Sequence, residues 1–423
     1  MLTGVFHTMR AHVIAATAAV ILLLAGAWPA TAAEPIKIGF GMALTGGLAG
    51  NGKAALIAIQ IWAEQVNAKG GLLGRPVQLV YYDDQTNPAT VPGIYTKLLD
   101  IDKVDLVISG YGTNLQAPAM PIIMQHGMTF IGLFGLAVND QFHYDRFFQM
   151  QPNGPDAKHA LSQGFLEAAM KANPKPKTLA IVGADAEYPQ VALSGARDVA
   201  KKLGLKIVYD NSYPPSTVDY TPIVRAIQAT NPDAVFVASY PPDTAGIIRA
   251  AHELDLKTTV FGGGMIGLQF SSLKQQFGPL LNGIVYYELY APEPTLNFPG
   301  ITDFLRTYQP RAAEAGADAL GFYLPPYAYA GMQILGEAVE ATKSLDQQKI
   351  AQYIHATSFK TVVGDVRFGK DGEWVEPRLI YVQERGIKGN DIEQFKQPGH
   401  EIVLYPSEFK SGDIVAPYAA AKH

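Results

Sequence analysis

Short apolar segments alternate with amphipathic segments along this chain in two successive series, and this alternation restricts the fold more than any other feature. Residues 36–40 predict a strand. Residues 51–69 predict a helix, because apolar side chains recur on one stripe and Gly70-Gly71 supplies a stop signal. Such an order is typical of α/β domains with mainly parallel sheets. Further strands are predicted at residues 77–82, 104–109, 128–133, 178–182, 205–209, 234–239 and 259–261.

The C-terminal part of the chain departs from this alternation. Residues 284–288 predict another strand, and residues 304–315 and 327–342 predict long helices. Residues 362–368 and 379–383 predict a β-hairpin, since an Asp-Gly pair between them supplies the positive φ that tight turns need.

The N-terminal segment, residues 1–33, has the features of a signal peptide. Arg10 is its one basic residue, and it precedes an apolar run too short to span a bilayer. The run ends in Ala30-Thr31-Ala32-Ala33, a small-residue cleavage site. We therefore expect export to the periplasm and a soluble mature protein, with either Met1 or Met9 as the true start.

Length and composition narrow the class further. A chain of 423 residues normally divides into two domains, because a single core stops growing at roughly 250–300 residues. The formal net charge of −5 disfavours nucleic acid as a partner. The absence of cysteine excludes a lipoprotein anchor, disulfides, a thiol nucleophile and Cys-ligated metal.

Several short motifs resemble, in order and spacing, the branched-chain amino acid (Leu/Ile/Val) binding proteins of bacterial ABC importers. The resemblance implies a type I periplasmic binding fold with two Rossmann-like lobes joined by three crossings. It implies an N-terminal lobe at 34–152 plus 285–361 and a C-terminal lobe with tail at 153–284 plus 362–423. The implied partners are a small-molecule ligand and an inner-membrane ABC permease, and we expect a monomer. The motifs are Ile36-Lys37-Ile38-Gly39, Leu44-Thr45-Gly46-Gly47, Val66-Asn67-Ala68-Lys69-Gly70-Gly71, Tyr82-Asp83-Asp84, Ile247-Ile248-Arg249-Ala250-Ala251 and Thr361-Val362-Val363-Gly364.

The end of the strand at residues 104–109 predicts part of a ligand site, because open parallel sheets bind ligands at the carboxyl ends of their strands. Tyr111, Thr113 and Asn114 follow this strand and lead into a helix, whose unpaired N–H groups favour a carboxylate. By position, Thr113 resembles the family's Ser or Thr that meets the ligand carboxylate. The alternative is that Thr113 or Asn114 only caps the helix.

Phe134, Gly135 and Leu136 follow the next strand and are predicted to line the same site. In the family this segment carries a small residue and a hydroxyl, and Leu136 occupies the hydroxyl position here.

Tyr188 and Tyr240 align with aromatic positions of the second lobe that close over the ligand in the family. Each could instead be an ordinary core or surface aromatic residue. Asn51 occupies a position that is often aromatic in the family, which predicts a more open wall.

Gly264 stands where amino acid binders of the family commonly carry an acidic residue that pairs with the ligand ammonium. A desolvated charge without its partner costs on the order of 2–5 kcal/mol. We therefore expect an aromatic acid or a hydrophobic 2-oxo acid, such as phenylpyruvate, as the ligand. A hydrophobic amino acid remains the alternative if the alignment is shifted, and a ligand-sensing receptor role remains a second alternative.

Enzyme functions are disfavoured by three incomplete motifs. Leu44 stands where a dinucleotide fingerprint needs its third glycine. His252-Glu253 lacks the second histidine of a zinc motif. Ser194 lacks the first glycine of a nucleophile elbow. We expect neither a cofactor nor a metal.

Overall fold

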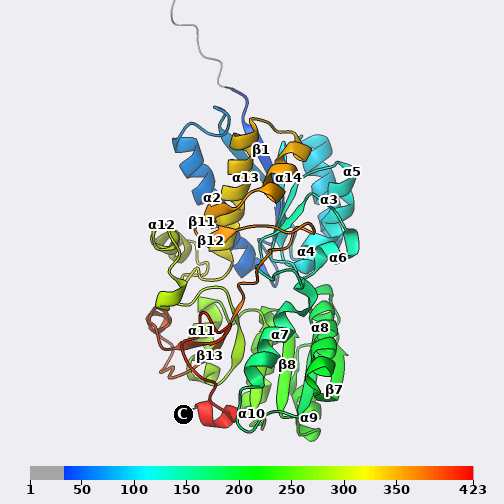
Figure 1. Cartoon of the computed structure of the whole chain (residues 1–423), viewed down its shortest axis with the longest axis vertical. Coiled ribbons are helices and arrows are strands. Elements are labelled where there is room, and N and C mark those ends of the chain that lie inside the picture. Colours follow the sequence, from blue (N-terminus) through cyan, green and yellow to red (C-terminus); the bar gives the residue numbers. More distant parts are fainter. Residues whose placement is uncertain (1–32, 423) are drawn as a thin grey trace, which may run out of the picture.

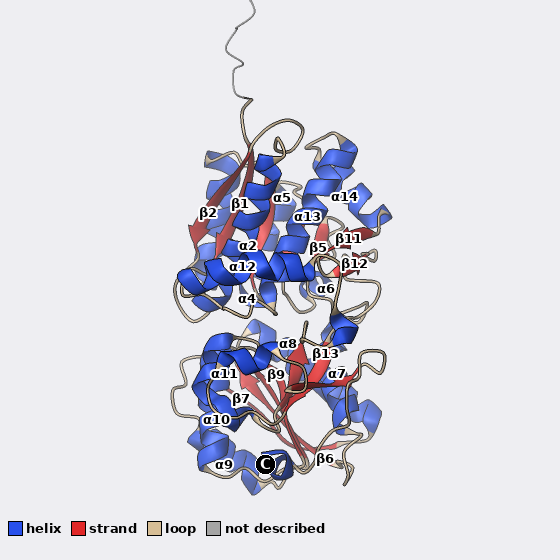
Figure 2. Ribbon diagram, turned by 90° about the vertical axis from the view of Figure 1, so that its left-hand side faces the viewer, coloured by secondary structure: helices blue, strands red, loops and turns tan. Residues whose placement is uncertain are grey.

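The chain forms two α/β lobes stacked along the long axis of the molecule (Figure 1), in a computed structural model that describes residues 33–422. The predicted signal peptide therefore lies outside the described residues, except for its last position. Each lobe has a sheet covered by helices, as Figure 2 shows. The prediction of an α/β fold with two lobes is confirmed. No helix within the described part of the chain has the length and apolarity needed to cross a membrane.

The first lobe contains a five-stranded parallel sheet in the order β2-β1-β3-β4-β5. The helices that cover this sheet come from two distant parts of the sequence. Helix α13, from the later part, packs against α2, from the earlier part. The strands are β1 (Ile36–Met42), β2 (Val77–Asp83), β3 (Leu106–Tyr111), β4 (Phe130–Leu133) and β5 (Phe147–Gln149). The helices are α2 (Ala49–Ala68), α3 (Val91–Thr96), α4 (Thr113–Gln116), α5 (Met120–Gln125), α6 (Val138–Phe142), α12 (Ile301–Glu314), α13 (Leu324–Thr342) and α14 (Gln347–Ala356).

The second lobe contains a seven-stranded sheet in the order β14-β13-β10-β9-β8-β6-β7. Its central strands are buried along their whole length because helices cover both faces, as is usual for parallel sheets. The strands are β6 (Thr178–Ala184), β7 (Lys206–Tyr213), β8 (Ala234–Ser239), β9 (Val260–Met265), β10 (Val285–Glu288), β13 (Ile380–Glu384) and β14 (Glu401–Tyr405). The helices are α7 (Ala157–Ala169), α8 (Glu187–Leu203), α9 (Thr221–Ala229), α10 (Pro241–Glu253) and α11 (Ser271–Phe277).

The strand pairing moves two of the predicted lobe boundaries. Strand β10 pairs with β9, so the chain leaves the second lobe after residue 288 and not before residue 285. Strand β12 (Gly364–Val366) pairs with β11 (Phe359–Thr361), so the first lobe extends past residue 361. The chain passes between the lobes after β5, after β10 and after β12.

The predicted hairpin of residues 362–368 and 379–383 is wrong. The turn forms, since a single bridge joins Phe368 to Trp374 across it. The flanking segments then separate, because β12 pairs with β11 and β13 pairs with β10 and β14.

A cluster of charges is buried beneath the antiparallel edge of the second sheet. Lys274 is fully buried, and its Nζ lies 2.8 Å from Glu384 Oε1 and 2.7 Å from Tyr286 Oη. It also contacts the carboxylate of Glu401. Burial, together with the charge of Glu401, raises the pKa of nearby Glu288 well above its ordinary value. The cluster thus holds more carboxyl groups than cations, and burial favours the neutral forms of Glu288 and Glu384.

Candidate ligand-binding site

The candidate site lies between the lobes, where the carboxyl ends of β3 and β4 face those of β6, β8 and β9. The lobes touch there directly. Asn114 Oδ1 of the first lobe accepts a hydrogen bond from the backbone N–H of Tyr188 of the second lobe at 3.0 Å. A Cβ placed on Gly112 would lie 3.2 Å from Tyr240 Oη. The structure therefore brings candidates from both lobes together.

Thr113 is not the cap of its helix. Gly112, with a φ of 92°, holds that position, and Thr113 begins α4. The Thr113 side chain is buried, and its Oγ1 accepts a hydrogen bond from the backbone N–H of Leu136 at 2.9 Å. A hydroxyl can accept and donate at once, so the Thr113 proton remains available.

The helix predicted to follow the strand at residues 104–109 is broken into shorter pieces. Helix α4 has only 4 residues before a 3₁₀ segment and α5 follow. The macrodipole of so short a helix contributes little, and a carboxylate at this place would depend on side-chain donors.

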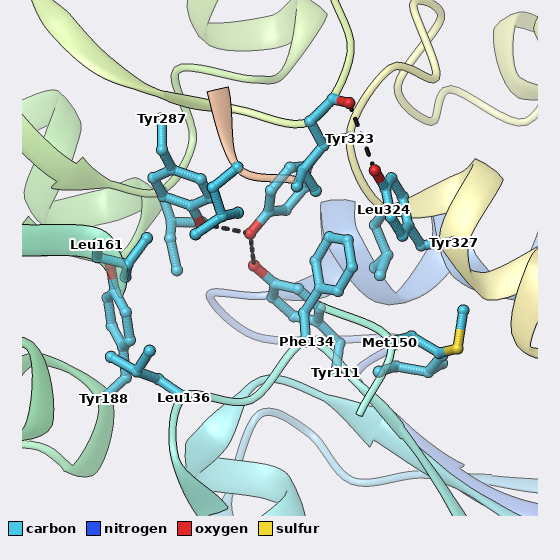
Figure 3. Packing of buried hydrophobic residues seen from close by; sticks show 14 of the residues in the cluster. Tyr111, Phe134, Leu136, Met150, Leu161, Tyr188, Tyr287, Tyr323, Leu324 and Tyr327 are labelled. Carbon is cyan, nitrogen blue, oxygen red and sulfur yellow. Dashed lines mark hydrogen bonds between the residues drawn. The ribbon is translucent and has the colours of Figure 1, made fainter. Parts of the chain in front are cut away.

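Three tyrosine hydroxyls form a chain that bridges the lobes, as Figure 3 shows. Tyr323 Oη lies 3.1 Å from Tyr111 Oη and 2.6 Å from Tyr287 Oη. Three hydroxyls carry three protons, and two hydrogen bonds use only two of them. Whatever the direction of the chain, one donor remains. Burial raises the pKa of Tyr111, Tyr287 and Tyr323, so each stays neutral and able to donate.

Tyr188 and Tyr240 lie beside each other, with ring centroids 5.2 Å apart. Tyr188 Oη donates to the backbone oxygen of Gly264 at 2.6 Å. Tyr240 Oη is buried and has no hydrogen-bond partner among the described residues. Burial raises the pKa of both phenols, which therefore remain protonated.

Gly264 does not leave open space beside it. A Cβ at this position would lie 2.6 Å from Tyr188 Oη and 3.6 Å from Leu161 Cδ1. The Tyr188 phenol therefore occupies the volume that a longer side chain at residue 264 would need. Gly264 acts through Tyr188, whose hydroxyl it holds.

The loop after β4 shapes the first-lobe side of the site. Phe134 has a φ of 59° and packs its ring edge-on against Tyr323 at 5.0 Å between centroids. Gly135 has no room for a side chain, since a Cβ would lie 2.5 Å from Gln116 Oε1. Leu136 is buried and is held by Thr113.

Asn51 lies in the first turn of α2 and is buried. Its Nδ2 group has no hydrogen-bond partner among the described residues. Together with Thr113, Tyr240 and the tyrosine chain, it makes the site rich in unused donors. None of these donors is hydrogen-bonded to a carboxylate of residues 33–422. An acceptor-rich group such as a carboxylate would satisfy them.

Comparison with known proteins identifies the family. Residues 35–386 match the model of a family described as periplasmic binding protein. This chain belongs to that family. It is similar to Leu/Ile/Val-binding protein homolog 2 of Brucella abortus (strain 2308), with 25% identity over 366 residues, covering 85% of this chain and 93% of the relative.

Solved structures share the fold of this periplasmic binding protein. A leucine-binding protein of Thermotoga maritima has a TM-score of 0.73 at 20% identity, over 88% of this chain and 99% of that one. A solute-binding protein of an ABC transporter from R. palustris, in complex with benzoate, has a TM-score of 0.73 at 17% identity, over 92% of this chain and 99% of that one. The type I periplasmic binding fold predicted from the sequence is confirmed.

One cavity of the periplasmic binding protein lies away from the lobe interface. It has a volume of about 690 Å³ and lies on the first lobe between α2 and α13, with Trp62 and Tyr329 in its wall. Smaller cavities of about 170 and 200 Å³ open between the lobes, one beside Tyr240 and Asn114, the other beside Asn51. We assign the ligand site to the interlobe region, because Tyr240 and Asn51, which carry unused donors, line these two smaller cavities. No three His, Cys, Asp or Glu side chains in residues 33–422 are grouped so as to hold a metal ion.

Proposed function

We propose that this protein is the solute-binding component of an ABC importer and works in the periplasm. Its ligand is a small carboxylate with a hydrophobic body, preferably an aromatic acid or an aromatic or branched 2-oxo acid. Membership of the periplasmic binding protein family supports the transport role. The similar fold of a solute-binding protein in complex with benzoate supports the ligand class.

The observation that carries the ligand class is the imbalance between donors and acceptors. Asn51 Nδ2 and Tyr240 Oη are buried donors without partners among residues 33–422, and Thr113 retains its proton. A buried donor without an acceptor costs about 1–3 kcal/mol, so a carboxylate oxygen is favoured over an ammonium group. The surrounding rings supply the apolar surface that an aromatic or branched body would bury.

A hydrophobic amino acid is the second candidate, because the similar relatives are named Leu/Ile/Val-binding proteins. Such a ligand needs an acceptor for its ammonium group. Asp243 is the acidic residue that lines the cavity beside Tyr240, but it already accepts from Tyr213 Oη at 3.1 Å. Burial also raises the pKa of Asp243, which weakens it as a counter-ion.

Calorimetry with matched ligand pairs tests this proposal. The pairs are phenylpyruvate with phenylalanine and 4-methyl-2-oxopentanoate with leucine, and benzoate serves as an acid without an α-substituent. Each acid is expected to bind more tightly than its amino partner. Tighter binding of leucine or phenylalanine would refute the preference for acids without an ammonium group. A lack of binding by every member would refute the proposed ligand class.

A further inference from the structure

Two of the three connections between the lobes run side by side and are hydrogen-bonded to each other. The backbone N–H of Gln149 donates to Gly372 O at 2.9 Å, and Trp374 Nε1 donates to Gln149 O at 2.9 Å. Further along, the backbone N–H of Arg378 donates to Pro152 O at 2.9 Å. The segments after β5 and after β12 must therefore move together when the lobes move.

Asn153 and Glu373 join these two segments through their side chains. Asn153 Nδ2 donates to Glu373 Oε2 at 3.4 Å and to Gly135 O at 3.2 Å. Both side chains are almost fully buried, at 3% and 2% exposed. Two acceptors face Nδ2, and this fixes the orientation of the amide. The pair thus connects the inter-lobe segments to the loop of the candidate site.

Two oxygens of this pair have no hydrogen-bond partner among the described residues. They are Asn153 Oδ1 and Glu373 Oε1. The amide of Asn153 and the carboxyl group of Glu373, to which these oxygens belong, are already joined by the hydrogen bond from Nδ2 to Oε2. A proton on Oε1 would turn this oxygen into a donor, and Asn153 Oδ1 is an acceptor without a partner on the group that Glu373 already contacts.

We propose that Glu373 carries a proton in the closed form, in which the two lobes touch as in this structure. Together with Asn153, it is then a positioning residue for the Phe134–Leu136 loop. The proton comes from solvent and sits on Glu373 Oε1, which donates to Asn153 Oδ1. Asn153 Nδ2 then donates one hydrogen to Glu373 Oε2 and the other to Gly135 O. The effect on ligand binding rests on the proposed function, whereas the protonation does not.

The surrounding charges favour the neutral acid. Burial raises the pKa of Glu373 well above its ordinary value, and the negative charges of Asp371 and Asp140 raise it further, while Asn153 opposes them. The other charged groups that act on Asp140 are His143, Asp156 and Lys158.

Ionisation of Glu373 would weaken its contact with Asn153 in the closed form. Oε1 and Asn153 Oδ1 would then face each other as two acceptors, and the connection to Gly135 would loosen. If opening of the hinge exposes Glu373 to solvent, its pKa falls toward the ordinary value. Affinity is then highest at low pH and decreases as pH rises between the open-form and closed-form pKa values of Glu373.

Benzoate titrations of the full mature protein between about pH 5 and 9 test the linkage. The Kd of the unmodified protein is expected to rise by up to about tenfold per pH unit within the window. Glu373→Gln imitates the neutral acid and should hold the low-pH Kd throughout. The matched control, Glu376→Gln, alters an exposed carboxylate of the same segment and should follow the unmodified protein. Equal slopes for the Glu373→Gln variant and the unmodified protein would overturn the linkage.

A measurement without ligand tests the proton itself. Carboxyl ¹³C NMR of protein with labelled glutamate, assigned with the Glu373→Gln variant, gives the pKa of Glu373 directly. A pKa clearly above the ordinary value supports the proposal. Ionisation at the ordinary value of about 4.3 would overturn it. The NMR measurement does not depend on benzoate binding. A failure of the protonation proposal is therefore distinguishable from a failure of the proposed function.

Discussion

Replacing Thr113 by valine should separate its two roles in the site. Valine keeps the shape of threonine and removes the hydroxyl. The buried N–H of Leu136 then loses its acceptor at 2.9 Å, which should lower the free energy of unfolding by about 1–3 kcal/mol. A carboxylate ligand would lose one donor at the same time. A hydrogen bond to a charged group contributes about 1.5–3 kcal/mol, which corresponds to an increase in Kd of about 10- to 150-fold.

Calorimetry with benzoate and urea denaturation of the same preparations measure the two effects separately. Thr113→Ser is the matched control, because it keeps the hydroxyl and removes one methyl group. It should retain a Kd close to that of the unmodified protein and lose about 0.8 kcal/mol of stability. If Thr113→Val lowers stability but leaves the Kd unchanged, Thr113 only holds the loop at Leu136 and does not bind the ligand carboxylate.

Three further predictions concern other parts of the molecule. Tyr240→Phe should raise the Kd for benzoate about tenfold or more without lowering the stability of the ligand-free protein, because the hydroxyl it removes has no partner in the described part of the chain; calorimetry and urea denaturation check this. Glu288 has a raised pKa, so native stability should decrease as pH rises through its folded-state value, and urea denaturation across pH should show a smaller decrease for Glu288→Gln. Small-angle scattering should show a smaller radius of gyration when phenylpyruvate is added to ligand-free protein, and an unchanged value at saturation would contradict closure of the lobes.

Local signals in the sequence predict most individual elements. The apolar stripe and the Gly70-Gly71 stop predict α2, and the structure places its end at Ala68. Pairing between distant strands has no comparable local signal. The apolar pattern of β10 is the same whichever sheet it joins, so the lobe boundary was placed too early. The Asp371-Gly372 turn was likewise predicted correctly, while the partners of the flanking strands were not.

The sequence likewise predicts some residues of the candidate site and not others. Thr113, Tyr188 and Tyr240 follow strand ends, and this position alone predicts that they face the space between the lobes. Tyr287 was missed because a tyrosine inside a buried strand has the pattern of a core residue. Tyr323 was missed because it precedes a helix in the returning segment.

The neighbour that fills the space beside Gly264 could not be predicted from the sequence. A glycine in the sequence indicates a missing side chain, but it does not show which neighbour fills the volume. The Tyr188 phenol does so from 76 residues away in the chain. A substitution such as Gly264→Glu would therefore displace Tyr188 and could not serve as a simple addition of charge.

The proposed activity is the binding of a small acid without an ammonium group between the lobes. Native mass spectrometry tests it most directly. The mature protein is incubated with equimolar phenylpyruvate, benzoate, leucine and phenylalanine, and unbound ligand is removed. We expect a one-to-one complex with the mass of phenylpyruvate or benzoate. A complex with the mass of leucine or phenylalanine would contradict it.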